Sequence, residues 1–288
     1  MEAIDLKGIR EIRCFMLDMD GTFYLGNQLL PGALEFIDLL KRLDIPFFFL
    51  TNNSSRNRGD YAEKIRKLGV IELLDSQVLT SGEATAIYLK NHIPSARLFI
   101  AGTPSLENEF LSQGFILTKD DPDAVVLGFD TTITYEKLWL VCDLVRSGKP
   151  FYATHPDINC PTEQGFMPDI GSILAFIEAS TGKRPDLIIG KPYSPIVEAM
   201  VEKTGLPIGS IAMVGDRLYT DIALGKAGLI TVLVLSGETR YEDLANSPFQ
   251  PDLTVWNLAD LIPILGNVFT GSIGRDGFRQ NTGWVHHL

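Results

Sequence analysis

Two pairs of aspartates in this 288-residue chain have spacings that suit chemistry on an anionic substrate. The first pair, Asp18 and Asp20, is followed by Gly21 and Thr22 and comes directly after the apolar run 14–17. Two carboxylates at i and i+2 provide a nucleophile with an acid/base beside it, and the glycine lets backbone amides approach an anion. The alternative interpretation of this segment is an ordinary aspartate-rich turn.

The second pair, Asp216 and Asp221, lies in a polar segment that follows the apolar run 211–214. The two acids are five residues apart and bracket a predicted strand-to-helix turn. Hard carboxylate oxygens in such a turn suit a divalent cation. The alternative is a polar loop with an acid at a helix N-terminus, where the helix dipole favours negative charge.

Two further polar segments also follow apolar runs. Thr51-Asn52-Asn53-Ser54-Ser55 comes after 47–50, and its hydroxyls and amides could hold phosphate oxygens or simply cap a helix. Gly190-Lys191-Pro192 comes after 187–189, and its lysine could neutralise phosphate charge or be a solvated surface residue. Each segment alone is a modest signal, but four in this order, each after a predicted strand, are hard to ascribe to chance.

Short apolar runs alternate with amphipathic stretches along the whole chain. Strands are predicted at 14–17, 47–50, 78–80, 98–100, 124–127, 151–153, 187–189, 211–214 and 230–235, and helices at 34–43, 61–68, 84–90, 106–111, 135–145, 172–179, 196–201 and 258–265. This alternation indicates the α/β class, with parallel sheets and crossover helices. In open sheets of this class ligands bind at the carboxyl ends of the strands, where the four polar segments lie.

Composition limits the classes of partner and compartment. The chain has 25 Lys+Arg and 36 Asp+Glu, a net charge of −11, which argues against nucleic-acid and membrane-surface binding. A small anionic substrate stays compatible, because charge within a site can oppose the net charge. The three cysteines Cys14, Cys142 and Cys160 lack metal-site spacing, and no signal peptide or apolar run of ~18 residues is present. We therefore expect a cytoplasmic protein with reduced thiols.

Taken together, the four segments resemble the motifs of the haloacid dehalogenase (HAD) superfamily of phosphatases. The segments Thr-Asn-Asn-Ser-Ser and Gly-Asp-Arg-Leu-x-Thr-Asp are more narrowly similar to its subfamily IIA, the NagD-like or 4-nitrophenylphosphatase type. The similarity runs from about residue 13 to residue 266, and no motif position departs from the pattern.

The resemblance implies a two-step phosphatase reaction. Asp18 attacks phosphorus and becomes an aspartyl phosphate, while Asp20 protonates the leaving alkoxide and then activates water. An alkoxide leaving group needs this second acid, which a dehalogenase does not, so a phosphatase is the better reading. The residues expected to bind phosphate are Gly21, Thr51, Asn52 and Asn53.

The third and fourth motifs are expected to supply positive charge. By resemblance, Lys191 pairs with the nucleophile and the transferring group. The resemblance also implies that Mg²⁺ is bound by Asp216, the Asp18 carboxylate and the Asp20 carbonyl, and that Asp221 orients metal-bound water. Without a cation these acids would repel a dianionic substrate. Asp20 must be protonated in the first step, which requires a raised pKa.

The spacing of the motifs locates a second domain. Only 33 positions separate Asp18 from Thr51, but 140 separate Thr51 from Lys191, far more than a βαβ unit of ~30 residues needs. We expect a catalytic core in 1–94 and 186–270, a cap domain in 95–185 and a tail in 271–288. The resemblance implies the same arrangement, a Rossmann-like parallel sheet core with a smaller α/β cap inserted between the second and third motifs.

A polar segment at 153–161 is the candidate loop for substrate recognition in the cap. It follows a predicted strand, has polar groups between two prolines and resembles the family's substrate-specificity loop; the alternative is a rigid connection. His155 fits a structural role as well as a catalytic one, and Tyr193 is a further candidate for lining the site. The expected substrate contacts are Asp157, Asn159 and Cys160.

The leading hypothesis is a Mg²⁺-dependent phosphatase that acts on a small phosphorylated metabolite, such as a sugar phosphate or 4-nitrophenyl phosphate. A phosphomutase would use the same aspartate pair but exclude water from the aspartyl phosphate. A non-catalytic metabolite-binding protein on the same fold would not need all four acids. A homodimer through the cap is a further expectation, since relatives often pair in this way.

Overall fold

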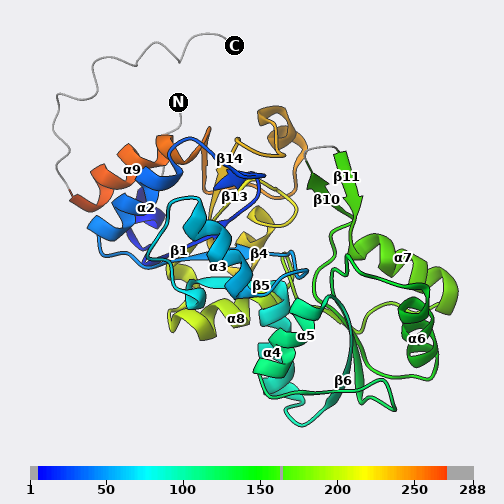
Figure 1. The fold of residues 1–288 in the computed structure, drawn as a ribbon. Helices are drawn as coiled ribbons and strands as arrows, with labels where there is room; N and C mark the ends of the chain where they lie inside the picture. Colours follow the sequence, from blue (N-terminus) through cyan, green and yellow to red (C-terminus); the bar gives the residue numbers. More distant parts are fainter. Residues whose placement is uncertain (1–5, 163–164, 271–288) are drawn as a thin grey trace.

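The computed structural model describes residues 6–162 and 165–270, so the tail predicted at 271–288 lies outside the described residues. The described chain forms two lobes, each built on a parallel sheet with helices on its faces (Figure 1). Within these residues no helix has the length and apolar character needed to cross a membrane. The α/β prediction is confirmed.

The first lobe is built on a six-stranded parallel sheet with the order β15-β14-β13-β1-β4-β5. β1 lies inside the sheet, pairs with β13 and β4, and is buried at every position. Its residues alternate between two hydrophobic cores: Phe15 and Leu17 face one, and Met16 faces the other. The strands are β1 (Cys14–Asp18), β4 (Phe47–Thr51), β5 (Val78–Thr80), β13 (Ile211–Gly215), β14 (Ile230–Val234) and β15 (Leu253–Val255).

Helices cover both faces of this sheet. α2 and α9 pack together over one face, where Phe36 of α2 and Leu261 of α9 enter the core that contains Phe15 (Figure 1). α4 and α8 pack together over the other face, where Met200 of α8 joins Met16. The helices of this lobe are α1 (Leu6–Arg10), α2 (Ala33–Arg42), α3 (Arg58–Lys67), α4 (Ser81–His92), α8 (Ser194–Thr204) and α9 (Leu258–Thr270).

The connections of the first lobe contain shorter elements. These are the hairpin β2 (Tyr24–Leu25) with β3 (Gln28–Leu29) and the 3₁₀ helices η1 (Asp75–Gln77), η2 (Ile208–Ser210), η3 (Ile222–Ala227) and η4 (Tyr241–Asn246). η3 follows Asp221, so the turn between Asp216 and Asp221 leads into a 3₁₀ helix.

The second lobe is built on a five-stranded parallel sheet with the order β12-β9-β8-β6-β7. Its strands are β6 (Arg97–Ala101), β7 (Ile116–Leu117), β8 (Ala124–Leu127), β9 (Phe151–Ala153) and β12 (Leu187–Ile188), and its helices are α5 (Pro104–Ser112), α6 (Tyr135–Arg146) and α7 (Ile170–Thr181). The domain limits at 94/95 and 185/186 stay a prediction, with one correction. β12, which those limits assign to the core, pairs with β9 of the second sheet, where Asp186 accepts the Phe151 N–H at 2.8 Å.

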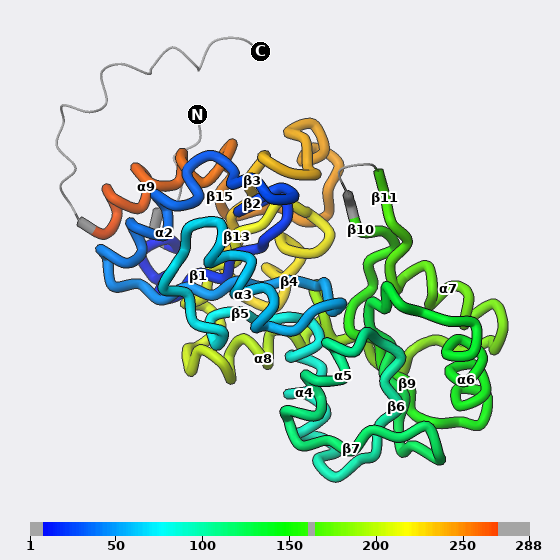
Figure 2. The backbone as a smooth tube through the Cα atoms, viewed as in Figure 1, coloured from blue at the N-terminus to red at the C-terminus, as the bar shows by residue number. Residues whose placement is uncertain are grey.

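The predicted recognition loop contains an element that the sequence pattern did not reveal. β10 (Asn159–Thr162) and β11 (Gly165–Pro168) form an antiparallel hairpin (Figure 2). The hairpin leaves the second lobe between β9 and α7 and contributes Asn159, Cys160 and Met167 to a cavity shared with the first lobe. The segment 153–161, predicted to be a loop of the cap, therefore ends in the first strand of a hairpin at the boundary of the two lobes.

Candidate active site

Three strand ends of the six-stranded sheet bring the polar segments together. Asp18 is the last residue of β1, Thr51 is the last residue of β4, and Asp216 comes directly after β13. The three strands are parallel neighbours, so their carboxyl ends meet at one edge of the sheet. The predicted convergence of these segments is thus present in the structure.

Gly21 allows the turn after β1 to pass close to Asp216. Its φ of 89° lies in the left-handed region, and a Cβ at this position would lie 2.8 Å from Asp216 Cγ. Only glycine meets both demands, because any Cβ is strained at this φ and would collide with the carboxylate.

Lys191 forms the electrostatic centre of the site. Its Nζ lies 2.6 Å from Asp18 Oδ1 and 2.6 Å from Asp221 Oδ1, and the lysine is 3% exposed. Burial alone would lower the pKa of Lys191, but the two aspartates outweigh burial and hold the pKa above its ordinary value. Lys191 is therefore a fixed positive charge beside Asp18.

Asp18, Asp216 and Asp221 each place a carboxylate oxygen within 4.8 Å of the other two. Asp216 Oδ2 accepts the Glu238 N–H at 2.7 Å, but Asp216 Oδ1 is buried without a hydrogen-bond partner among the described residues. Burial, with the charge of Asp221, raises the pKa of Asp216 to about 7. Burial also raises the pKa of Asp18 well above its usual range, against the opposing effect of Lys191. Buried oxygen donors that lack full compensation fit a hard divalent cation such as Mg²⁺.

Asp20 has the environment expected of a general acid. It is partly buried and lines the cavity, and burial raises its pKa above the ordinary value. The positive charges of Lys64 and Arg217 oppose this rise. A carboxyl group with a raised pKa holds its proton to higher pH, as donation to a leaving group requires.

The side chain of Asn52 joins the end of β4 to the third motif and to the second lobe. Its Oδ1 accepts the Lys191 N–H at 2.8 Å, and its Nδ2 donates to Lys191 O at 3.0 Å and to Asp157 Oδ1 at 3.1 Å. These contacts use both amide hydrogens, so the side chain of Asn52 holds Lys191 and Asp157 in place. Phosphate binding by Asn52 stays a prediction.

A cavity of about 990 Å³ extends from this cluster to the second lobe. The predicted site residues that line it are Asp18, Asp20, Thr51, Asn52, Asn53, Asp157, Asn159, Cys160 and Lys191. Asn53 Nδ2 approaches Cys160 Sγ at 3.8 Å, which connects the second motif to the hairpin. These predicted residues of both lobes thus face one space, whereas Gly21, Asp216 and Asp221 are not among the residues that line it.

Tyr193 does not line this cavity, so the prediction made from its position beside Lys191 is wrong. The chain turns after Lys191, with the Tyr193 N–H donating to Gly190 O at 3.0 Å. Tyr193 is the N-cap residue that precedes α8, and 41% of its surface is exposed.

Four basic residues that line the cavity were not predicted as site residues: Arg56, Lys64, Lys67 and Arg217. Arg217 Nε lies 2.9 Å from Glu238 Oε2, and Arg217 Nη1 lies 3.7 Å from Asp157 Oδ2. Its place in the fourth motif, next to Asp216, is a signal that could have identified it. Lys64 of α3 has its Nζ 3.7 Å from the Tyr24 ring centroid, and no feature of the sequence around it indicated this position.

Comparisons with known proteins agree with the fold and the motifs. A family model for haloacid dehalogenase-like hydrolases matches residues 15–116, and a second HAD-hydrolase-like model matches residues 188–261. The chain is 36% identical over 245 residues to an acid sugar phosphatase of Staphylococcus epidermidis, covering 84% of this chain and 94% of that protein.

Solved structures show the same similarity. A 4-nitrophenylphosphatase from Thermotoga maritima has 50% identity and a TM-score of 0.86, covering 89% of this chain and 98% of its own. The NagD protein of Escherichia coli K-12 has 32% identity and a TM-score of 0.80, covering 86% and 98%.

Proposed function

Because the chain belongs to the haloacid dehalogenase-like hydrolases, in their NagD-like subfamily IIA, we propose that it is a Mg²⁺-dependent phosphatase acting on small phosphate monoesters. The observation that carries the proposal is the buried contact of Lys191 with Asp18 at the base of a cavity that Asp20 also lines. A carboxylate nucleophile, a fixed cation and a carboxylic acid with a raised pKa are the groups that this reaction needs.

In the first step Asp18 forms a bond from its carboxylate oxygen to phosphorus while the bond from phosphorus to the leaving oxygen breaks. Asp20 gives its proton to that leaving oxygen. Lys191 holds Asp18 by its Oδ1 and offsets negative charge on the transferring group. The products of the step are the free alcohol and an aspartyl phosphate on Asp18.

In the second step Asp20, now ionised, takes a proton from a water molecule that attacks phosphorus. The bond between phosphorus and the Asp18 oxygen breaks, which regenerates the carboxylate and releases phosphate. Two displacements of this kind divide a barrier that must be lowered by roughly 20 kcal/mol for monoester hydrolysis.

The Asp18 and Asp216 carboxylates, with the Asp20 carbonyl, are the groups we assign to Mg²⁺. When bound, the ion supplies positive charge that offsets the carboxylates and the phosphate dianion. Asp221 has a positioning role as well, because Oδ1 pairs with Lys191 at 2.6 Å and Oδ2 accepts the Arg217 N–H at 3.1 Å. Its proposed action on water at the metal rests on the family resemblance.

The cavity supports a leaving group of sugar or aryl size. Its volume of about 990 Å³ is at the upper end of the range usual for small-molecule sites. The related proteins are named as an acid sugar phosphatase and a 4-nitrophenylphosphatase, so sugar phosphates and aryl phosphates are the substrates to test first. Asp157, Asn159 and Cys160 would contact the leaving group from the second lobe.

The proposal also includes a cytoplasmic location and a homodimer that forms through the second lobe. Cys14 and Cys142 are buried free thiols, which supports a reducing, cytoplasmic location. The net charge of −11 supports a protein without nucleic-acid or membrane partners. Exposure of Tyr135 and Trp139 on α6 supports pairing of two copies through the second lobe.

The experiment that tests the proposal is phosphate release by the purified protein with Mg²⁺. Sugar phosphates, phosphoglycolate, pyridoxal phosphate, nucleotides and 4-nitrophenyl phosphate would be compared, with Asp18→Asn as the control. Hydrolysis by the natural chain and none by Asp18→Asn is the expected result. No release from any ester, or equal rates for the two proteins, would overturn the proposal, and transfer of phosphate within a sugar would indicate a mutase.

A further inference from the structure

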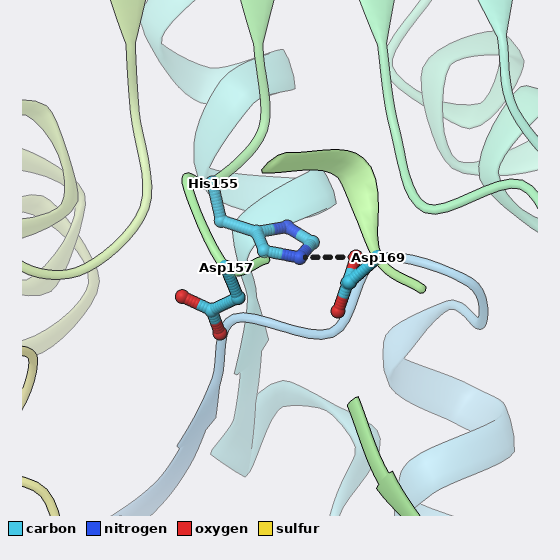
Figure 3. Close-up of side chains that lie close together, drawn as sticks. All are labelled: His155, Asp157 and Asp169. Atoms are coloured by element: carbon cyan, nitrogen blue, oxygen red, sulfur yellow. Dashed lines mark hydrogen bonds and ion pairs between the residues drawn. The ribbon is translucent and has the colours of Figure 1, made fainter. Parts of the chain in front are cut away.

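At the wall of the cavity, which Asp169 lines, His155 and Asp169 form a buried pair (Figure 3). His155 Nε2 lies 3.0 Å from Asp169 Oδ1, and the residues are 0% and 3% exposed. With Asp157 they are close enough to hold a metal ion, but both ring nitrogens of His155, Oδ1 of Asp169 and both carboxylate oxygens of Asp157 have protein partners. Asp169 Oδ1 also accepts the Ile170 N–H at 2.6 Å, and Asp157 contacts Asn52 and Arg217. The cluster is therefore a hydrogen-bond network.

The network continues on the other side of the imidazole ring, through two hydroxyl groups. His155 Nδ1 lies 3.1 Å from Thr154 Oγ1, which in turn lies 2.9 Å from Ser54 Oγ. A hydroxyl chain from Ser54 through Thr154 can donate to Nδ1, which leaves the proton on Nε2 to be donated to Asp169.

Asp169 and the start of α7 hold the backbone that carries Asp157. The Asp169 N–H donates to Ile158 O at 2.9 Å, and the Gly171 N–H donates to Asp157 O at 2.8 Å. A Cβ on Gly171 would lie 2.9 Å from the carbonyl carbon of Asp157, so α7 packs directly on this segment. The position of Asp169 therefore determines the position of Asp157.

Asp157 is where the second lobe contacts two core motifs. Its Oδ1 accepts from Asn52 Nδ2 at 3.1 Å, and its Oδ2 lies 3.7 Å from Arg217 Nη1. The side chain of Asn52 in turn binds both the backbone N–H and the carbonyl oxygen of Lys191. A contiguous set of contacts thus runs from His155 to the backbone of the catalytic lysine.

We propose that His155 and Asp169 are a positioning pair that fixes Asp157 against Asn52 and Arg217, and so sets the alignment of the active site from the second lobe. The inference rests on the proposed phosphatase function. In this proposal His155 does not contact the substrate. The buried pair affects turnover only because it determines the position of Asp157.

A double-mutant cycle tests this route with 4-nitrophenyl phosphate as substrate. We expect His155→Ala and Asp157→Ala each to lower kcat/KM by about 10- to 100-fold, as small misplacements of reacting groups do. The double variant should be no more than about twofold worse than Asp157→Ala, because both changes break one route. Effects that multiply would overturn the inference.

Conservative and matched variants separate positioning from loss of stability. Asp169→Asn keeps an acceptor for the Nε2–H and for the Ile170 N–H, so it should retain most of the activity that Asp169→Ala loses. Thr134→Ala removes the hydroxyl that accepts the Lys137 N–H at the start of α6, in the same lobe but away from Asp157. Thr134→Ala should leave kcat/KM unchanged, and a loss equal to that of Asp169→Ala would contradict the proposal.

Hydrogen exchange gives a readout that does not depend on turnover. His155→Ala should speed amide exchange at 169–171, where the Asp169 and Gly171 N–H groups hold the segment, and Thr134→Ala should not. Unchanged exchange there would overturn the positioning role, even if the natural chain hydrolysed no ester. Hydrolysis by the natural chain that His155→Ala leaves intact would overturn the inference and leave the phosphatase proposal standing.

Discussion

Lys191 and Asp18 form a buried ion pair, with Nζ 2.6 Å from Oδ1 and 173 positions of chain between them. The pair joins the end of β1 to the point where the chain returns from the second lobe, after β12. Insertion of the second lobe therefore leaves the nucleophile and its cation in contact, and the two lobes meet around them.

Replacement of Lys191 by methionine removes this cation while keeping a long side chain. We expect kcat to fall by about 10²- to 10³-fold, since a group that offsets charge on the transferring phosphoryl is lost. Stability should fall by about 3 kcal/mol, because Asp18 and Asp221 remain buried without their partner. Phosphate release and urea unfolding check the two effects, and a variant with natural kcat would remove Lys191 from the mechanism.

Asp20→Asn should affect substrates according to their leaving groups. A 4-nitrophenolate leaves without a proton, whereas a sugar alkoxide needs the proton of Asp20. We expect the variant to lose at least about tenfold more of its activity on a sugar phosphate than of its first-step rate on 4-nitrophenyl phosphate.

The measurement for Asp20→Asn is rapid-mixing kinetics, with release of 4-nitrophenolate followed over the first turnover. A burst followed by a slow steady state is expected, since the second step still needs a base. Asp18→Asn, with no nucleophile, serves as the control and should show no burst. Equal losses on the two kinds of ester would contradict the acid role of Asp20.

Gly21→Ala and Gly114→Ala form a matched pair of variants. Their φ angles are 89° and 90°, but a Cβ at Gly21 would meet Asp216 while a Cβ at Gly114 would meet nothing within 4 Å. Both should lose about 1 kcal/mol of stability from backbone strain. Only Gly21→Ala should also lose activity and Mg²⁺ affinity, as measured by turnover and titration calorimetry. Equal activity in the two variants would show that the close approach to Asp216 has no function.

The stability of the metal-free protein should fall as pH rises toward 7. The pKa of Asp216 is about 7 in the folded protein and near 3.8 when unfolded, so the folded state binds more protons between these values. The free energy of unfolding then decreases with rising pH across this window. Mg²⁺ should remove the decrease, because it stabilises the ionised carboxylate.

Urea unfolding at pH 5 and pH 8, with and without Mg²⁺, measures this linkage. The stabilisation by Mg²⁺ should be larger at pH 8, and Asp216→Asn should flatten the dependence that remains without the ion. Equal Mg²⁺ effects at both pH values in the natural chain would contradict the assignment of Asp216 to the metal.

The local pattern of the sequence determined the class of the fold and the four polar segments. Apolar runs such as 47–50 need burial on both faces, so they identify buried parallel strands, and residues that follow such strands meet at one edge of the sheet. For this reason the sequence alone places Asp18, Thr51 and Asp216 together. The family assignment from the same segments is confirmed by the matches to related proteins.

Only the tertiary structure decided how the two lobes meet. β12 pairs with β9 in the second sheet, and a strand of two residues carries little local signal for the sheet to which it belongs. The hairpin of β10 and β11, the contact of Asp157 with Asn52 across 105 positions, and the burial of His155 against Asp169 all depend on contacts between segments that are distant or irregular in pattern. Periodicity records which face of an element is buried, but the partner that buries it, or accepts its proton, is set by packing in three dimensions.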